Sequence, residues 1–406
     1  MDQLKKILQL PEVKKVFKVF GESSIFLVGG CVRDTLMNKS VTDIDFATPC
    51  EPLEVIEILN KSEINYFDIG IKFGTVTAII DEKKYEITSF RKDIKTDGRH
   101  AEVEFSKEME EDAARRDFTM NALYVDKDCK IYDFYNGQED LKNNTLRFIG
   151  EPQTRIKEDY LRIMRFFRFL TSNSAHSPDS DLLTILKAEA PNLLIISKER
   201  LWDEFTEILK SESPITALIL MQENAILENI SEGLQVEESF ENLISIESKT
   251  KDINPILRLS LLLDNNSKKI EDFVNSFPLS SNESKALVQL GEMNEKIVSY
   301  LSMKEVRFLL YKMGVSNFKN QVIINWARDV QNKSEVNWRS LYEVAISWER
   351  PKFDLDSKDV MGMGINEGPL VGLILKEVEE WWAENDFIDD KFSLIERLKA
   401  ICQAHK

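Results

Sequence analysis

Several features that mark other protein classes are scarce in this chain of 406 residues. The four cysteines are scattered without CxxC spacing, which argues against a zinc site or a disulfide framework. The three histidines leave no His-Asp pair for a phosphohydrolase of that type. No apolar run approaches the ~20 residues that span a bilayer, and the first residues read as a charged amphipathic helix rather than a signal peptide. We therefore expect a cytoplasmic protein without a membrane-spanning segment.

Positive charge is also scarce, because 53 Lys and Arg face 70 Asp and Glu, for a net charge of −17. Nucleic-acid binding depends on cations that contact phosphates, so an RNA-binding role requires basic residues that are concentrated locally. Residues 147–168 provide such a concentration, with six Lys or Arg against three Asp or Glu. The length of the chain predicts about two to four domains.

An apolar strand, a glycine turn and two acids follow one another in residues 25–51. Residues 25–28 read as a strand, Gly29 and Gly30 break it, and Arg33 lies where a helix would begin. The backbone N–H groups at such a turn can meet phosphate, and the arginine adds positive charge. This arrangement predicts a phosphate-binding segment.

Asp43 and Asp45 come shortly afterwards, in a short run that reads as a strand. Residues i and i+2 of a strand point to one face, so the two carboxylates would lie side by side, roughly 6–7 Å apart along the strand. Two like charges in that position are unfavourable, and divalent metal ions would relieve the repulsion. Together with the glycine turn, the pair predicts a site for a metal-bound triphosphate.

A helix over residues 158–169, EDYLRIMRFFRF, carries a stripe of charge beside an apolar stripe. Asp159, Arg162, Arg165 and Arg168 recur every three residues, which makes successive members neighbours on one side of a helix. Arginines so closely spaced repel one another unless an anion lies between them. The stripe therefore favours binding of a triphosphate or RNA over a merely solvated face.

Further motifs complete the pattern: EITSFR, which contains Glu86, then RRDFTMNA at 115–122, YNGQEDL and LRFIG near 135–150, and SKERL at 197–201. In this order and spacing they resemble the DNA polymerase β-like nucleotidyltransferases, and most closely the class II tRNA nucleotidyltransferases and related poly(A) polymerases. The resemblance covers nearly the whole chain and is strongest over residues 25–170.

The resemblance assigns a role to each motif. It implies that Asp43, Asp45 and Glu86 are catalytic and that Asp43 and Asp45 hold two Mg²⁺ ions. It implies that Asp159 and Arg162 read the base. It places the nucleotide against Gly29, Gly30, Arg33, Arg116, Asp117, Asn121, Asp159, Arg162, Arg165 and Arg168.

The resemblance also implies an α+β architecture with four parts. A DNA polymerase β-like nucleotidyltransferase head with a small mixed β-sheet, residues 1–140, is followed by an all-helical neck (141–215), body (216–330) and tail (331–406). Within the head we expect one helix over residues 1–20. We expect a long flexible loop over 91–105, with Arg91, Asp97 and Arg99 as its candidate functional residues.

The implied activity is addition of CCA to the 3′ end of tRNA from CTP and ATP, without a nucleic-acid template, by a monomer that binds no membrane. Poly(A) polymerases usually carry an arginine-rich segment after the acidic pair, whereas this chain has GIKFGTVTAII there. CC-only addition is disfavoured because the 91–105 segment is retained, while A-only addition stays open. A non-catalytic RNA-binding relative would have lost acids from the pair, and both are present.

Overall fold

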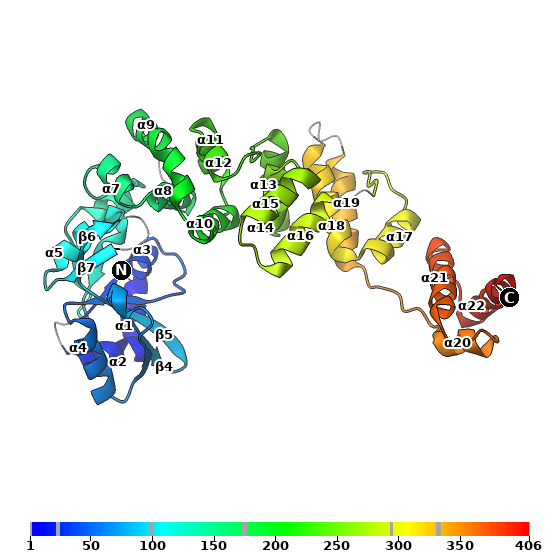
Figure 1. Cartoon of the computed structure of the whole chain (residues 1–406), viewed down its shortest axis with the longest axis horizontal. Coiled ribbons are helices and arrows are strands. Elements are labelled where there is room, and N and C mark those ends of the chain that lie inside the picture. The colour runs from blue at the N-terminus through cyan, green and yellow to red at the C-terminus, as the bar shows by residue number, and fades with distance from the viewer. Residues whose placement is uncertain are drawn as a thin grey trace. The chain divides into compact units, whose positions relative to one another are not determined.

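The computed structural model describes residues 2–21, 25–96, 101–172, 177–292, 295–329 and 334–405. The chain divides into two compact units, Met1–Leu234 with Ser276–Pro278, and Gln235–Asn275 with Leu279–Lys406 (Figure 1). The first unit contains the sheets and the second is helical, which confirms the α+β class expected from the sequence. In the part of the chain that is described, no helix combines the length and apolarity needed to cross a bilayer.

A mixed sheet forms the centre of the first unit. In the described residues it has seven strands in the order β3-β4-β5-β2-β1-β8-β9. Its strands are β1 (Phe26–Val28), β2 (Asp45–Thr48), β3 (Asn65–Phe67), β4 (Thr75–Ile80), β5 (Lys83–Ser89), β8 (Leu123–Val125) and β9 (Ile131–Asp133). Strand β2 is central: it pairs antiparallel with β1 and parallel with β5, so its first residue is fixed from both sides.

One face of this sheet is covered by α1 (Asp2–Gln9), α2 (Pro11–Phe20), α3 (Gly30–Leu36) and α4 (Pro52–Lys61), whose apolar residues share a core with the strands. The alternation of β4 supplies Val76, Ala78 and Ile80 to that core, as a half-buried strand requires. The single helix expected over residues 1–20 is wrong. Pro11 begins a second helix because it restricts the preceding residue, Leu10, to an extended conformation.

The segment expected to be a flexible loop is also different. Strands β6 (Arg91–Thr96) and β7 (Ala101–Phe105) form an antiparallel ribbon that pairs Arg91 with Phe105. Asp97 and Arg99 lie outside the described residues. Glutamates alternate with uncharged residues along β7, a pattern typical of a strand. Lys92 lies opposite Glu104, and a cross-strand pair of opposite charges stabilises the ribbon.

Helices make up most of the rest of the first unit: α5 (Met109–Ala114), α6 (Gly137–Lys142), α7 (Pro152–Glu158), α8 (Leu161–Ser172), α9 (Ser180–Glu189), α10 (Lys198–Lys210), α11 (Ile215–Glu223) and α12 (Ile226–Ile230). The helix expected over 158–169 is interrupted. Asp159 is extended (φ −152°, ψ 104°), and its Oδ1 accepts a hydrogen bond of 3.1 Å from Leu161 N at the start of α8.

The second unit is built from α13 (Glu238–Thr250), α14 (Pro255–Leu262), α15 (Ser267–Ser276), α16 (Ser281–Gly291), α17 (Met303–Met313), α18 (Val315–Arg328), α19 (Glu335–Ser347), α20 (Ser357–Gly362), α21 (Pro369–Glu384) and α22 (Lys391–Ala404). The last three helices share an apolar core to which Tyr311 of α17 contributes. The division into four domains stays a prediction.

Candidate nucleotide and metal site

The glycine turn joins β1 to α3 at the centre of the site. Gly29 has φ +71°, a conformation that glycine adopts without steric cost. A Cβ at Gly29 would lie 3.6 Å from Nη1 of Arg116, so the guanidinium lies close above the turn. The fold therefore places Arg116 of the RRDFTMNA motif beside the GG motif, in agreement with the nucleotide site that the resemblance implied.

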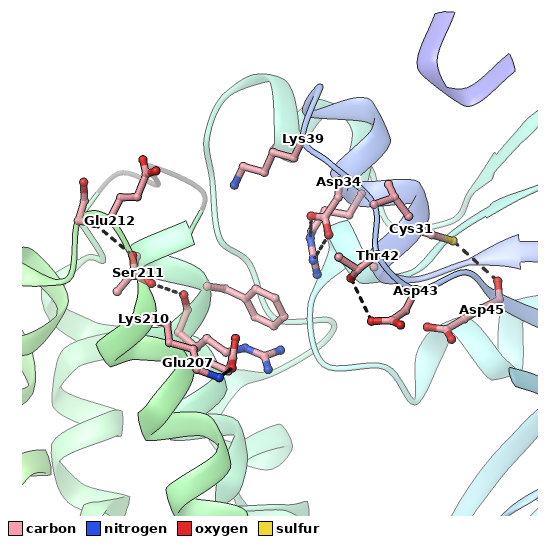
Figure 2. A pocket seen from close by; sticks show the side chains of 17 residues that line it. Cys31, Asp34, Lys39, Thr42, Asp43, Asp45, Glu207, Lys210, Ser211 and Glu212 are labelled. Atoms are coloured by element: carbon pink, nitrogen blue, oxygen red, sulfur yellow. Dashed lines mark hydrogen bonds and ion pairs between the residues drawn. The ribbon is translucent and has the colours of Figure 1, made fainter. Parts of the chain in front are cut away.

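Three carboxylates gather where β2 begins. Asp45 is the first residue of β2 and lies opposite Glu86 in the parallel pair with β5. Asp43 precedes the strand and is exposed, which differs from the expectation that both acids lie within it. Asp43 and Asp45 nevertheless direct their carboxylates to the same side (Figure 2).

The electrostatics of this cluster suit a cation. Burial raises the pKa of Asp45 to about 6, Glu86 and Asp43 act in the same direction, and Arg116 partly opposes them. Among the described residues no three His, Cys, Asp or Glu side chains form a complete metal cage. Mg²⁺ commonly binds through one or two carboxylates plus substrate phosphates, so Asp43 and Asp45 fit that ion once a triphosphate is present.

A cavity of about 430 Å³ lies beside the carboxylates. It is lined by Gly29, Gly30, Arg33, Asp45, Arg115, Arg116, Asp117, Asn121, Asp159, Arg162, Arg165, Arg168 and Phe169. All ten residues that the sequence assigned to nucleotide binding are in this set. Arg115 and Phe169 were not assigned to the site, although both lie within the quoted motifs, as the first residue of RRDFTMNA and the last of EDYLRIMRFFRF.

Arg116 is held by a buried acid that the sequence analysis also missed. Asp112, 1% exposed, accepts from Arg116 Nη2 at 2.9 Å and from the Tyr124 hydroxyl at 2.6 Å, and it pairs with Arg115 at 2.7 Å. Burial alone would raise the pKa of Asp112, but the two arginines hold it well below its usual range. The charged carboxylate therefore anchors both arginines at the cavity.

A second network crosses the cavity from α3 to α8. Arg33 Nη1 donates to Asn121 Oδ1 at 2.7 Å, and Asn121 Nδ2 donates to Asp117 Oδ1 at 2.9 Å. Arg165 Nε donates to the other oxygen of Asp117 at 2.6 Å. Although burial opposes ionisation, Arg165 and the hydrogen bonds lower the pKa of Asp117 to about 2. These contacts fix two cations at the cavity, Arg33 from α3 and Arg165 from α8.

Asp159 and Arg162 both line the cavity, but each is held by another residue. Arg200 Nη2 at the start of α10 donates to Asp159 Oδ2 at 2.8 Å. Arg162 Nη1 donates to Glu158 Oε2 at 2.7 Å and to the Arg155 carbonyl at 2.6 Å. Arg200 was noted in the sequence as part of the SKERL segment, where Ser197 caps α10 as expected. Its contact with Asp159 could not be read from the sequence.

A larger cavity of about 780 Å³ is lined by both Asp43 and Asp45 (Figure 2). It shares Gly30, Arg33, Asp45, Arg168 and Phe169 with the first cavity. Its other walls come from the segment between α3 and β2 and from the end of α10. Asp45 thus borders two cavities, and a reactant in each could meet at this carboxylate.

Known proteins match the chain over most of its length. The family described as "Poly A polymerase head domain" matches residues 25–147, and "Probable RNA and SrmB- binding site of polymerase A" matches residues 177–237. The mitochondrial CCA tRNA nucleotidyltransferase 1 of Homo sapiens is 29% identical over 418 residues, which cover 97% of this chain and 92% of the human protein. The CCA-adding enzyme of Streptococcus suis is 29% identical over 417 residues, which cover 97% and 96%.

The fold is that of a solved relative as well. The crystal structure of the Bacillus stearothermophilus CCA-adding enzyme in complex with CTP has a TM-score of 0.67 at 23% identity, covering 100% of this chain and 99% of that one. Motifs, fold and relatives agree: the chain belongs to the family of poly(A) polymerases and tRNA nucleotidyltransferases.

Proposed function

We infer that this chain adds CCA to the 3′ end of tRNA from CTP and ATP, without a nucleic-acid template. The observation that carries this function is the position of Asp45 between two cavities, one of which is lined by arginines. A nucleoside triphosphate in the arginine-lined cavity and an RNA 3′ end in the larger one would meet at the carboxylates. The chain also matches relatives named for CCA addition over 97% of its length.

The arginines and the carboxylates of the site have different roles in the proposed reaction. Arg33, Arg116 and Arg165 bind and orient the triphosphate, and their networks hold them in place before it arrives. We propose that Asp43 and Asp45 hold two Mg²⁺ ions, with Glu86 beside them. When bound, such ions supply activation of the attacking 3′-hydroxyl and neutralise charge on the phosphates and on the leaving pyrophosphate.

We propose that Asp159 and Arg162 choose the base. Cytosine and adenine both present an amino donor beside a ring-nitrogen acceptor, whereas uracil and guanine present a carbonyl beside an N–H. A carboxylate accepts from the amino group and a guanidinium donates to the ring nitrogen, so one pair of side chains suits both accepted bases. The contacts with Arg200 and Glu158 hold this pair at the cavity wall.

The reaction is tested with tRNA that ends at the discriminator base, supplied with each nucleotide singly and then with CTP and ATP together. We expect CTP alone to extend the tRNA by two residues, ATP alone to add nothing, and both together to complete CCA. An enzyme that adds A only would give no product with CTP. Long adenosine tails would indicate a poly(A) polymerase. No product on this tRNA would indicate an A-adding enzyme if tRNA ending in CC is extended by ATP, and a non-catalytic relative if it is not.

The β6–β7 ribbon offers a test of how the site changes from C to A. It follows β5, the strand that carries Glu86, and Lys92 pairs with Glu111 of α5 at 2.5 Å. Because the same side chains must accept first C and then A, we propose that this segment moves between the two steps. Replacing residues 91–105 by a short Gly/Ser linker should lower A addition by about tenfold or more, ~1.4 kcal/mol in the barrier, and spare CC addition.

The test measures the rate of a single CTP addition to tRNA ending in the discriminator base and of a single ATP addition to tRNA ending in CC. The two rates show whether the ribbon selects the nucleotide. Lys92→Ala is the matched control, since it removes a charged contact of the ribbon but keeps its length. Equal loss of C and A addition in the replacement would show that the ribbon does not select the nucleotide.

Two further expectations stay predictions. We propose a cytoplasmic location; the mitochondrial relative of Homo sapiens and the bacterial relative of Streptococcus suis are each 29% identical to the chain. The monomeric state is likewise an expectation, which sedimentation of the purified protein would test.

A further inference from the structure

One aromatic ring lies among three of the cavity arginines. The guanidinium carbons lie 4.8 Å (Arg33), 5.4 Å (Arg165) and 4.5 Å (Arg168) from the centre of the Phe169 ring. Phe169 is 3% exposed and lies at the boundary that the two cavities share. Among the described residues that line these cavities, it is the one aromatic side chain.

The three arginines pair with two different acids. Asp34 pairs with Arg33 through two contacts of 2.8 Å, and Glu204 of α10 takes one contact of 3.2 Å from each of Arg165 and Arg168. The arginines also repel one another: burial lowers the pKa of Arg168, Glu204 opposes this, and Arg165 and Arg33 add to the lowering. Glu204 therefore brings Arg165 and Arg168 together, whereas the pair with Asp34 and the repulsion between the arginines oppose the approach of Arg33.

The ring supplies the opposing attraction. A guanidinium over an aromatic ring is attracted by the negative charge of the ring face, and more so where water is excluded. The ring itself is held from behind by Phe118, which follows Asp117 in the chain and contacts Phe169 edge-on at 5.4 Å between centroids. Phe169 is thus a fixed point to which three cations from α3 and α8 are drawn.

We propose that Phe169 is a positioning residue for the triphosphate: its ring holds Arg33, Arg165 and Arg168 at a spacing that suits the phosphates. This inference deepens the proposed function and rests on it for the identity of the natural ligand. It makes no use of the base, so its effect should be the same for CTP, for ATP and for inorganic triphosphate.

The test compares Phe169→Leu with Phe166→Leu. Leucine keeps an apolar side chain and removes the ring. Phe166 is a suitable control because it lies on the same helix, is 1% exposed, and packs on Phe148 at 6.0 Å and Phe118 at 6.4 Å. Both variants lose a buried ring, so thermal unfolding should show a lower Tm for each.

We expect Phe169→Leu alone to weaken binding of CTP, ATP and inorganic triphosphate, by about tenfold each, which corresponds to ~1.4 kcal/mol. Titration calorimetry measures the three dissociation constants, and KM for CTP and ATP should rise by similar factors while kcat changes less. Phe169→Tyr, which keeps the ring, should bind inorganic triphosphate within about threefold of the parent.

Unchanged triphosphate binding in Phe169→Leu, or an equal loss in Phe166→Leu, would overturn the inference. A loss confined to ATP or to CTP would also overturn it, because the ring would then act on the base. Binding of inorganic triphosphate involves no reaction, so the inference is decided even if the parent protein fails to extend tRNA. That failure would instead count against the proposed function.

Discussion

Asp45→Asn is expected to lower nucleotide incorporation by about a thousandfold or more. Asparagine keeps the size of the side chain but removes the negative charge that the proposed Mg²⁺ ions require. Metal ions stabilise the charge of such a transition state by several kcal/mol, and ~4 kcal/mol corresponds to about a thousandfold in rate. Asp43→Asn should have the same effect. Single-turnover incorporation of CTP measures the loss, and binding of tRNA should stay near that of the parent.

Asp128→Asn is the matched control for these variants. Asp128 is exposed in the turn between β8 and β9, where it pairs with Lys127 at 3.1 Å, and it lines neither of the two cavities. Its loss should leave incorporation unchanged. Turnover within about tenfold of the parent in Asp43→Asn or Asp45→Asn would contradict the assignment of both acids as metal ligands.

Asp159→Ala is expected to relax the choice of base. In the parent, a uracil or guanine places a carbonyl against the carboxylate, and unpaired buried polar groups cost ~1–3 kcal/mol each, or about tenfold to a hundredfold per contact. Without the carboxylate this penalty disappears, so UTP or GTP should compete measurably with CTP while use of CTP itself declines. The measurement is kcat/KM for each of the four nucleotides on the same tRNA.

Another reading of Asp159 makes a different prediction. If its pair with Arg200 merely connects α8 to α10, Asp159→Ala should lower the Tm slightly and leave the choice of base alone. Lys157→Ala provides the comparison, because Lys157 of α7 pairs with Glu189 at 3.5 Å and lies outside the cavity. It should lower stability by a similar small amount. Strict use of CTP and ATP by Asp159→Ala would favour the purely structural role.

Most residues of the site could be identified from the sequence. The hydrogen bonds and ion pairs among them could not be predicted. The GG turn and the Asp43–Asp45 pair were recognised because their chemistry is local. The break at Asp159 was missed because the surrounding residues all favour helix. One oxygen of Asp159 accepts from Leu161 N at the start of α8, and the other accepts from Arg200, 41 residues away in the chain. Such tertiary contacts override local propensity and leave no periodic pattern.

The β6–β7 ribbon and the larger cavity could not be predicted from the sequence either. The sequence of residues 91–105 has few apolar residues, so it predicted a polar loop. The strands β6 and β7 of the ribbon were therefore not expected. The larger cavity combines the segment after α3 with residues at the end of α10, such as Lys210 and Glu212. No motif joins these segments, and their meeting depends on how α8 and α10 pack.

The central place of β2 has a consequence for repeated additions. Asp45 is anchored by neighbouring strands on both sides, whereas Asp43 stands before the strand and has more freedom. In the proposed reaction three nucleotides are joined one after another at a single carboxylate cluster that cannot travel along the product. The growing RNA end must therefore retreat by one nucleotide after each addition, while Asp45 remains the stationary reference against which every new 3′-hydroxyl is aligned.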